Sequence, residues 1–290
     1  MGIFIFANEM VIRLGCFAAV LATMVAWELR LPRRAGEGGL RMRRWRANLG
    51  LVALDTVILR VLFPLAAVGA ALMANDRGWG LFNAVAAPPW LAVGLSLVIL
   101  DLAIYAQHVA FHKIALLWRL HRVHHTDVAL DATTGLRFHP IEIVASMLLK
   151  IALVTALGAP ALAVVIFEVA LNAFAMFNHS NVYLPRWVDA RLRRLIVTPD
   201  MHRAHHSIHR DETDSNYGFN LSLWDRLFGT YRDQPRDGHV TMALGLDGFR
   251  DPREDRLFRL LVQPFLRDGN RPREQTPRQP LNLSGGDSTG

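Results

Sequence analysis

The sequence His121-Arg122-Val123-His124-His125-Thr126 returns almost unchanged as His202-Arg203-Ala204-His205-His206-Ser207. Both copies read H-R-x-H-H-[S/T], and a shorter cluster, His108-x-x-x-His112, lies upstream of them. Residues three and four apart share one face of an α-helix. The spacing therefore predicts three helices whose histidine faces converge on one site.

The number of histidines indicates a pair of metal ions. The three clusters contain eight imidazoles, and imidazole is the commonest metal ligand in proteins. One tetrahedral zinc takes only four ligands, so the count exceeds a single site. For one cluster, surface histidines with no shared role are an equally good explanation. Three clusters in one chain make that explanation much weaker.

Four apolar regions predict an all-α integral membrane bundle. In this 290-residue chain 52% of the residues are hydrophobic, and apolar runs cover residues 10–28, 49–74 and 87–107. Each run can cross a bilayer, which takes about 20 residues. The fourth region, 143–178, contains Gly158-Ala159-Pro160 and predicts a helical hairpin that enters the membrane and returns. Any single run would also suit a buried core helix.

Basic residues predict the orientation of the spans and one kind of partner. The loop after the first run is rich in arginine, whereas the loop after the second contains only Arg77. The positive-inside rule places the first loop, and with it every histidine cluster, on the cytoplasmic side of an inner or plasma membrane. Much of the net charge of +7 lies in this loop, where it can meet anionic lipid, so no nucleic-acid partner is expected. The loop contains Arg30, Arg33, Arg34, Arg41, Arg43, Arg44 and Arg46.

Two single histidines flank the hairpin and are candidate ligands. His139 precedes Pro140, which restricts it to an extended or turn conformation, and His179 ends the second helix. Glu142 lies in the first turn of the hairpin, where contact with a ligand histidine and interaction with the helix dipole explain it equally well. The only cysteine, Cys16, excludes a thiolate cluster and an intramolecular disulfide in this chain. The first apolar run lacks the basic start and cleavage site of a signal peptide.

Four charged residues have simpler expected roles. Asp127 and Asp200 flank the H-R-x-H-H clusters and are expected to accept N–H bonds from ligand imidazoles. Asp55 and Arg60 lie inside the second apolar run and are expected to face the bundle rather than lipid.

Taken together, these motifs resemble the fatty acid hydroxylase/sterol desaturase superfamily of integral membrane di-metal oxygenases. The resemblance covers about residues 40–265 and extends beyond the H-R-x-H-H clusters. The combination of those clusters with the sequence W-D-R-L-F-G-T-Y is specific. The further matching stretches are Arg137-Phe138-His139-Pro140-Ile141-Glu142, Phe177-Asn178-His179-Ser180-Asn181, Asn216-Tyr217-Gly218 and Trp224-Asp225-Arg226-Leu227-Phe228-Gly229-Thr230-Tyr231.

The resemblance implies a helical membrane domain with a cytosolic histidine-rich helical cap that holds two iron ions (Fe²⁺/Fe³⁺). It implies that O₂ is a co-substrate and that a separate donor, a ferredoxin or a b-type cytochrome with its reductase, supplies electrons. The implied reaction is hydroxylation or desaturation of a C–H bond in a sterol-like, fatty acyl or isoprenoid lipid. The metal ligands carried over are His108, His112, His121, His124, His125, His139, His179, His202, His205 and His206, with no further catalytic residue.

This assignment divides the chain into three parts. Residues 1–46 are expected to form the first transmembrane helix and a basic cytoplasmic loop, and residues 47–266 the membrane-embedded catalytic domain. Residues 267–290 are rich in Gly, Pro, Ser, Arg and Gln, a composition typical of a disordered tail.

Other classes of protein remain as alternatives. A non-catalytic membrane metal-binding protein would need a polar path through spans that are mostly apolar. A haem electron-transfer protein would pair single histidines within the spans. A zinc hydrolase needs only three protein ligands.

Overall fold

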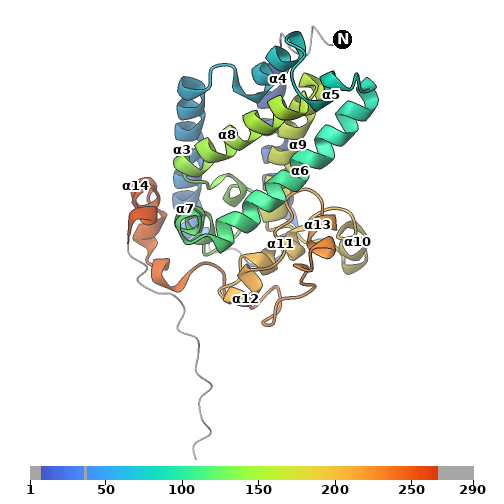
Figure 1. The fold of residues 1–290 in the computed structure, drawn as a ribbon. Helices are drawn as coiled ribbons and strands as arrows, with labels where there is room; N and C mark the ends of the chain where they lie inside the picture. The colour runs from blue at the N-terminus through green and yellow to red at the C-terminus, as the bar shows by residue number, and fades with distance from the viewer. Residues whose placement is uncertain (1–7, 36–37, 267–290) are drawn as a thin grey trace, which may run out of the picture.

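A computed structural model describes residues 8–35 and 38–266, and Figure 1 shows that this part of the chain is built from helices. The predicted all-α fold is confirmed. The long helices are α2 (Glu9–Arg30), α3 (Gly38–Leu62), α4 (Ala66–Asp76), α6 (Pro89–Lys113), α8 (Pro140–Leu157) and α9 (Ala161–His179). The shorter ones are α5 (Leu81–Ala84), α7 (Ala115–His125), α10 (Arg186–Leu192), α11 (Pro199–His205), α12 (Arg210–Thr213), α13 (Leu223–Leu227) and α14 (Leu257–Val262). Single 3₁₀ turns are η1 (Thr134–Leu136), η2 (Asp247–Phe249), η3 (Pro252–Asp255) and η4 (Gln263–Phe265).

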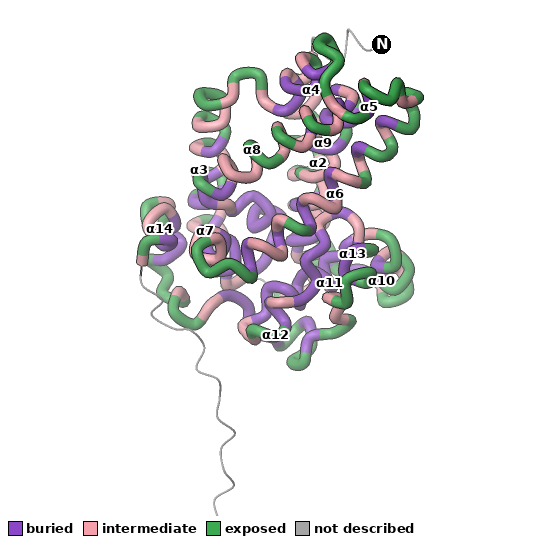
Figure 2. Tube along the Cα trace, in the orientation of Figure 1, coloured by how far each residue is buried: buried purple, intermediate pink, exposed green. Residues whose placement is uncertain are grey.

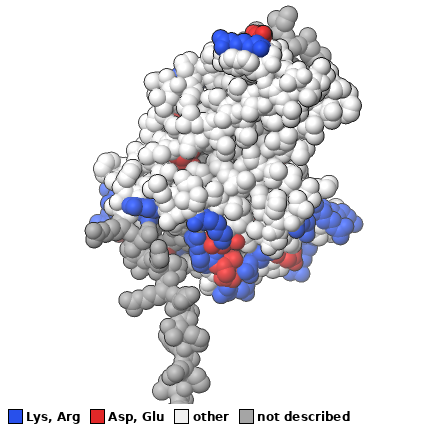
Figure 3. All heavy atoms as spheres, viewed as in Figure 1, with Lys and Arg blue, Asp and Glu red and all other residues white. Residues whose placement is uncertain are grey.

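Five helical segments of the described residues are long and apolar enough to cross a membrane. Many of their large apolar side chains point outward, as Trp90 at 75% and Val61 at 72% exposure illustrate. Figure 3 shows a broad, largely uncharged band across the middle of this surface, with a small charged patch at the upper tip and more charged side chains at the lower end. The protein is therefore an integral membrane protein. The five segments are Glu9–Arg30, Arg41–Ala84, Pro89–Lys113, Pro140–Leu157 and Ala161–His179.

The predicted hairpin is present as α8 and α9. Gly158 ends α8 with φ of 63°, in the left-handed region that favours glycine. A Cβ atom at this position would also lie 2.5 Å from the carbonyl oxygen of Trp79. Pro160 then precedes the first residue of α9. The turn thus depends on the two residues that predicted it.

The second apolar run differs from the expected single span. It divides into α3, which ends at Leu62, and α4, which begins at Ala66. Pro64 lies in the break, and proline lacks the N–H that a helix interior requires. The small side chains of Ala67 and Ala71 are fully buried, and α4 packs against α8 and α9 at the upper end of the bundle (Figure 1).

The basic loop also differs from expectation, because α3 already begins at Gly38 and its arginines contact protein rather than lipid alone. Arg44 is buried, and its guanidinium donates to Asp131 Oδ2 and to Asp127 Oδ2, each at 2.8 Å. Arg33 pairs with Asp200 at 3.0 Å. These ion pairs connect the first two helices to the lower part of the molecule.

The lower part, which contains α7 and α10 to α14, forms a cap on the bundle. Figure 2 shows long runs of buried residues here, whereas in the upper helices buried residues are interspersed with exposed and half-buried ones. The buried side chains of this cap include many histidines and the guanidinium groups of Arg122, Arg137 and Arg203. A polar core of this kind is stable only when its groups are paired with one another or bind a ligand.

Candidate metal centre

Four helices bring the histidine clusters together at the junction of the bundle and the cap. His108 and His112 lie in the last turns of α6, and α7 carries the cluster of His121. His179 is the last residue of α9, and α11 carries His202 and His205, with His206 as its C-cap. These histidines, together with His124 and His125 of α7, are all buried, with exposures of 5% or less.

The ring nitrogens form two adjacent groups. His108, His112, His121, His125 and His205 make up the first group, and His124, His179, His202 and His206 make up the second. Within each group one nitrogen of every ring lies within 4.8 Å of the others. The groups adjoin, since the rings of His125 and His206 are 4.5 Å apart between centroids.

The separation of the nitrogens suits metal ligation. In the first group the Nε2 atom of His108 lies 3.1 Å from those of His121 and His205. In the second, the Nε2 atom of His179 lies 2.9 Å from those of His124 and His202. Two nitrogen ligands in adjacent positions, each about 2.1 Å from one ion, lie about 3.0 Å apart.

Hydrogen bonds on the opposite ring nitrogen orient four of these imidazoles. The Nδ1 atom of His108 lies 2.8 Å from the Tyr217 carbonyl, and that of His205 lies 2.6 Å from the Ser215 carbonyl. The Nδ1 atom of His179 is likewise 2.7 Å from the carbonyl of Ala175, and that of His121 is 2.7 Å from Glu142 Oε1. An N–H that donates from Nδ1 leaves the Nε2 lone pair free for a metal.

Other ring nitrogens test the fit of a metal directly. Both ring nitrogens of His206 and the Nε2 atoms of His112 and His125 are buried and have no hydrogen-bond partner among the described residues, whereas His112 Nδ1 lies 3.4 Å from Asp214 Oδ1. Burial also lowers the pKa of His121 to about 3, and burial together with neighbouring histidines lowers the pKa of His124, His125, His202, His205 and His206 well below the usual value. Neutral imidazoles with unpaired, inward lone pairs are the form that binds metal, so the residues fit two metal ions. The rings contact one another, which leaves no space for a porphyrin between them.

His139 is not brought to either group. It is the N-cap of α8, where its Nδ1 atom accepts a hydrogen bond from the Ile141 amide at 3.2 Å. Its Nε2 atom lies 3.2 Å from the Leu261 carbonyl. Both ring nitrogens therefore have protein partners, because the turn before Pro140 directs the ring toward the start of α8 and α14.

The carboxylates near the clusters divide into two roles. Glu142 contacts His121 and also lies in the first turn of α8, so its position agrees with both explanations offered by the sequence. The expectation for Asp127 and Asp200 was wrong, because both accept hydrogen bonds from arginine. Burial opposes ionisation of Asp127, but Arg44 and Arg137 outweigh it and hold its pKa at about 2.

The W-D-R-L-F-G-T-Y stretch holds in place the backbone next to the histidines, a role that was not predicted from the sequence. Asp225 accepts hydrogen bonds from the amides of Tyr217 at 2.7 Å and Gly218 at 2.8 Å. Trp224 donates to Asp101 in α6 at 2.7 Å. The stretch thus fixes the Tyr217 carbonyl that contacts His108.

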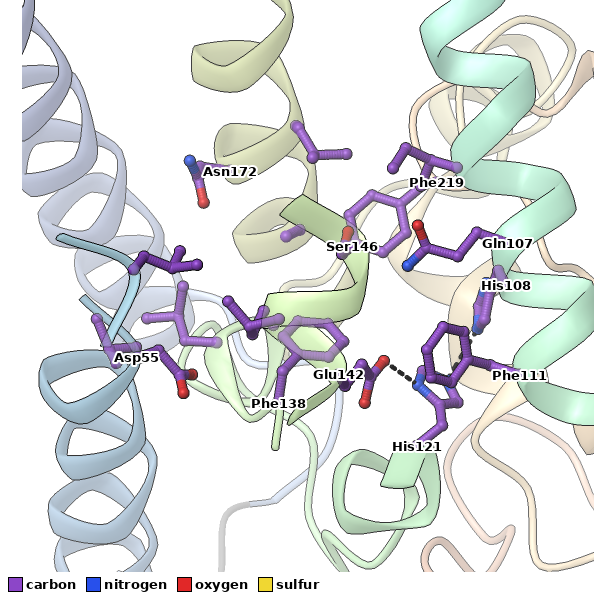
Figure 4. Close-up of a pocket in the computed structure, with 18 of the residues that line it drawn as sticks. Asp55, Gln107, His108, Phe111, His121, Phe138, Glu142, Ser146, Asn172 and Phe219 are labelled. Carbon is purple, nitrogen blue, oxygen red and sulfur yellow. Dashed lines mark hydrogen bonds and ion pairs between the residues drawn. The ribbon is translucent and has the colours of Figure 1, made fainter. Parts of the chain in front are cut away.

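A cavity of about 230 Å³ lies between the spanning helices and the first histidine group. Figure 4 shows His108 and His121 on one side of it, with Glu142 reaching toward His121. Most of its wall is apolar, for example Phe111 and Phe138. The cavity can therefore hold an apolar group next to the first histidine group.

Comparisons with known proteins agree with this arrangement. The model of the fatty acid hydroxylase family matches residues 93–230, which include both histidine groups. An ornithine lipid hydroxylase (OlsE) of Rhizobium tropici is 34% identical over 192 residues, which cover 63% of this chain and 53% of the relative. Alkylglycerol monooxygenase of Xenopus tropicalis is 26% identical over 196 residues, which cover 64% of this chain and 41% of the relative.

A third relative, cholesterol 25-hydroxylase of Rattus norvegicus, is 26% identical over 142 residues, which cover 49% of this chain and 47% of the relative. The chain thus spans about half the length of the curated relatives it matches. No solved structure matches it.

Proposed function

We infer that the chain belongs to the fatty acid hydroxylase/sterol desaturase superfamily, and we propose that it is a membrane-bound di-iron oxygenase that oxidises a C–H bond of a lipid. The observation that carries the proposal is the convergence of two adjacent groups of buried histidines, the first of which borders an apolar cavity through His108 and His121. We further propose that the catalytic unit comprises residues 47–266.

Nine histidines are the proposed ligands, five in the first group and four in the second. Imidazole suits iron, and neutral ligands leave the positive charge of the metals uncompensated. When bound, a pair of irons would supply the oxidant for C–H cleavage from O₂ and two electrons. A separate ferredoxin or b-type cytochrome with its reductase is the proposed electron donor.

The chain's own residues bind the substrate and exclude water. The apolar wall around Phe111 and Phe138 would hold a lipid chain against His108 and His121. Glu142 holds the His121 ring in one orientation, so that the ligand does not rotate away from the metal. Residues of the spanning helices α2, α3, α6, α8 and α9 line the cavity, so we propose that the lipid enters it from the bilayer.

Hydroxylation is favoured over desaturation. The three relatives are named hydroxylases or monooxygenases, and their names refer to ornithine lipid, alkylglycerol and cholesterol. A sterol-like, fatty acyl or isoprenoid lipid remains the proposed substrate class. The histidine groups are proposed to face the cytoplasm, because Arg33 and Arg44 of the arginine-rich stretch pair with Asp200 and Asp127, which flank the histidine clusters.

Elemental analysis and a lipid oxidation assay test the proposal together. Detergent-purified protein from iron-supplemented cells should contain two irons per chain and no haem absorbance, and it should oxidise a lipid with O₂ and a reductant. His124→Ala and His205→Ala should each lose metal and activity but still insert into the membrane. His209→Ala is the matched control, because His209 pairs with Asp237 at the surface. Full activity of His124→Ala or His205→Ala would contradict the assignment.

A further inference from the structure

Two carboxyl groups in the cavity have oxygens without a partner. Asp55, 7% exposed, reaches the cavity from α3, and Glu142, 4% exposed, reaches it from α8 (Figure 4). Asp55 Oδ1 and Glu142 Oε2 are buried and accept no hydrogen bond from any described residue. Glu142 still contacts His121 through its other oxygen, whereas no described residue donates to Asp55.

The surroundings of the cavity do not satisfy these acceptors. No lysine or arginine is found among the described residues that line it. Thr56 donates to the Val52 carbonyl of its own helix, and Asn172 donates to the Glu168 carbonyl. A buried carboxyl without a partner is costly, and inside a membrane such groups generally mark a functional site.

The sequence predicted that Asp55 and Arg60 would both face the bundle. Asp55 does so, whereas Arg60 is exposed and its charge acts on Glu168 of α9 rather than on Asp55. Arg60 therefore does not neutralise Asp55 within the cavity. Gln107 and Ser146 also line the cavity, but neither donates to Asp55, so a bound molecule can supply the missing donor.

We propose that the cavity selects a lipid whose chain carries a hydrogen-bond donor, a hydroxyl or an ammonium group, and that Asp55 binds this donor. The proposal rests on the proposed function, since it takes the cavity as the substrate site. The volume of about 230 Å³ is below the range of about 300–1,000 Å³ typical of pockets that enclose a whole ligand. The cavity therefore holds a segment of the lipid that includes the donor.

The position of Asp55 determines where oxidation takes place. Figure 4 shows Asp55 on the side of the cavity opposite His108 and His121. A donor held by Asp55 places a different carbon of the same chain beside these histidines. The new oxygen is therefore inserted at a fixed separation from the existing polar group.

Binding of simple amphiphiles to the full-length protein in lipid nanodiscs tests the selection. The dissociation constants of hexadecanol and hexadecylamine should lie well below those of hexadecyl methyl ether and hexadecane, which have no donor. Asp55→Leu should weaken binding of the alcohol and the amine by about tenfold or more and remove this preference. Asp55→Asn keeps an acceptor oxygen, so it should retain the alcohol and lose the advantage of the amine.

Thermal unfolding separates a binding role from a structural one. Asp55→Leu removes an unpaired buried carboxyl, so the ligand-free variant should unfold at the same temperature as the wild type or higher. Asp76→Asn, which changes an exposed carboxylate at the end of α4, is the matched control and should alter neither binding nor stability. A lower unfolding temperature for Asp55→Leu, or an unchanged preference for the alcohol, would overturn the proposal.

The two proposals fail in different ways. A protein that binds the alcohol through Asp55 but oxidises no lipid would contradict the oxygenase function and leave the selection intact. A lipid oxygenase that binds hexadecyl methyl ether as tightly as hexadecanol would contradict the selection alone.

Discussion

The Nδ1 atom of His121 lies 2.7 Å from Oε1 of Glu142, a buried contact between the cap and the hairpin. The other nitrogen of the same ring faces the first histidine group. A carboxylate in this position sets both the tautomer and the orientation of a metal ligand. The contact makes the hairpin helix α8 part of the metal site although α8 contributes no histidine to either group.

Glu142→Ala should lower the affinity for Fe²⁺ about 10-fold to 100-fold, the usual effect of removing such a partner. Glu142→Gln should be milder, because its amide oxygen still accepts from His121. Titration against a competing chelator measures both. Asp237→Asn, which removes the surface partner of His209, is the control. Equal affinities in all variants would show that Glu142 does not support the ligand.

His179→Gln and His139→Gln should have opposite effects on metal content. His179 contributes an inward nitrogen to the second group, so its loss should reduce iron from two ions per chain toward one. His139 is occupied by Ile141 and Leu261, so its replacement should leave two. Elemental analysis of both variants provides the measurement. Loss of iron from the His139→Gln variant would show that His139 is a tenth ligand.

Acid should destabilise the metal-free protein between about pH 6.5 and pH 3. The unfolded chain binds protons on histidine below about pH 6.5, whereas the folded pKa of His121 is about 3 and those of His202 and His205 are also far below the usual value. Because folding lowers these pKa values, the unfolded state binds protons first as the pH falls. The stabilisation is therefore complete above pH 6.5 and declines below it. Unfolding temperatures of the apoprotein from pH 7.5 to pH 5 should therefore decrease. A flat profile would argue against neutral histidines in the core.

Cysteine labelling should show both ends of the bundle on opposite sides of the membrane. In a Cys16→Ser background, Trp79→Cys at the α4 end should react with an impermeant maleimide in intact cells. Val240→Cys, in the cap, should react only after the membrane is opened. Both side chains are exposed, at 42% and 55%. Reversed labelling would place the histidine groups outside the cytoplasm and overturn the positive-inside assignment.

The sequence predicted those features that depend on local spacing. Histidines at intervals of three and four must share a helical face, so the clusters on α6, α7 and α11 followed from the chain alone. The hairpin followed from Gly158 and Pro160, which have few other uses within an apolar stretch. Helix type is a property of neighbouring residues, and the all-α prediction was correct.

Features that depend on distant partners were not predictable. The length of the apolar run 49–74 does not reveal that the chain changes direction at Pro64. Asp127 lies next to a histidine cluster, yet Arg44, which is 83 residues away, is its partner. The direction of the His139 ring is likewise set by its two partners, the first turn of α8 and the distant Leu261. Only the packed chain shows which of several nearby groups a polar side chain contacts.

The dependence of both histidine groups on α11 sets the order of events in biosynthesis. His205 belongs to the first group and His202 and His206 to the second, and all three follow the last apolar segment, which ends at His179. A ribosome that translates this chain has therefore delivered every span to the insertion machinery before either site has its full set of ligands. Under the proposed function, iron would be loaded after insertion, onto a chain already anchored in the bilayer, and a truncated product that lacks α11 would reach the membrane with no complete site.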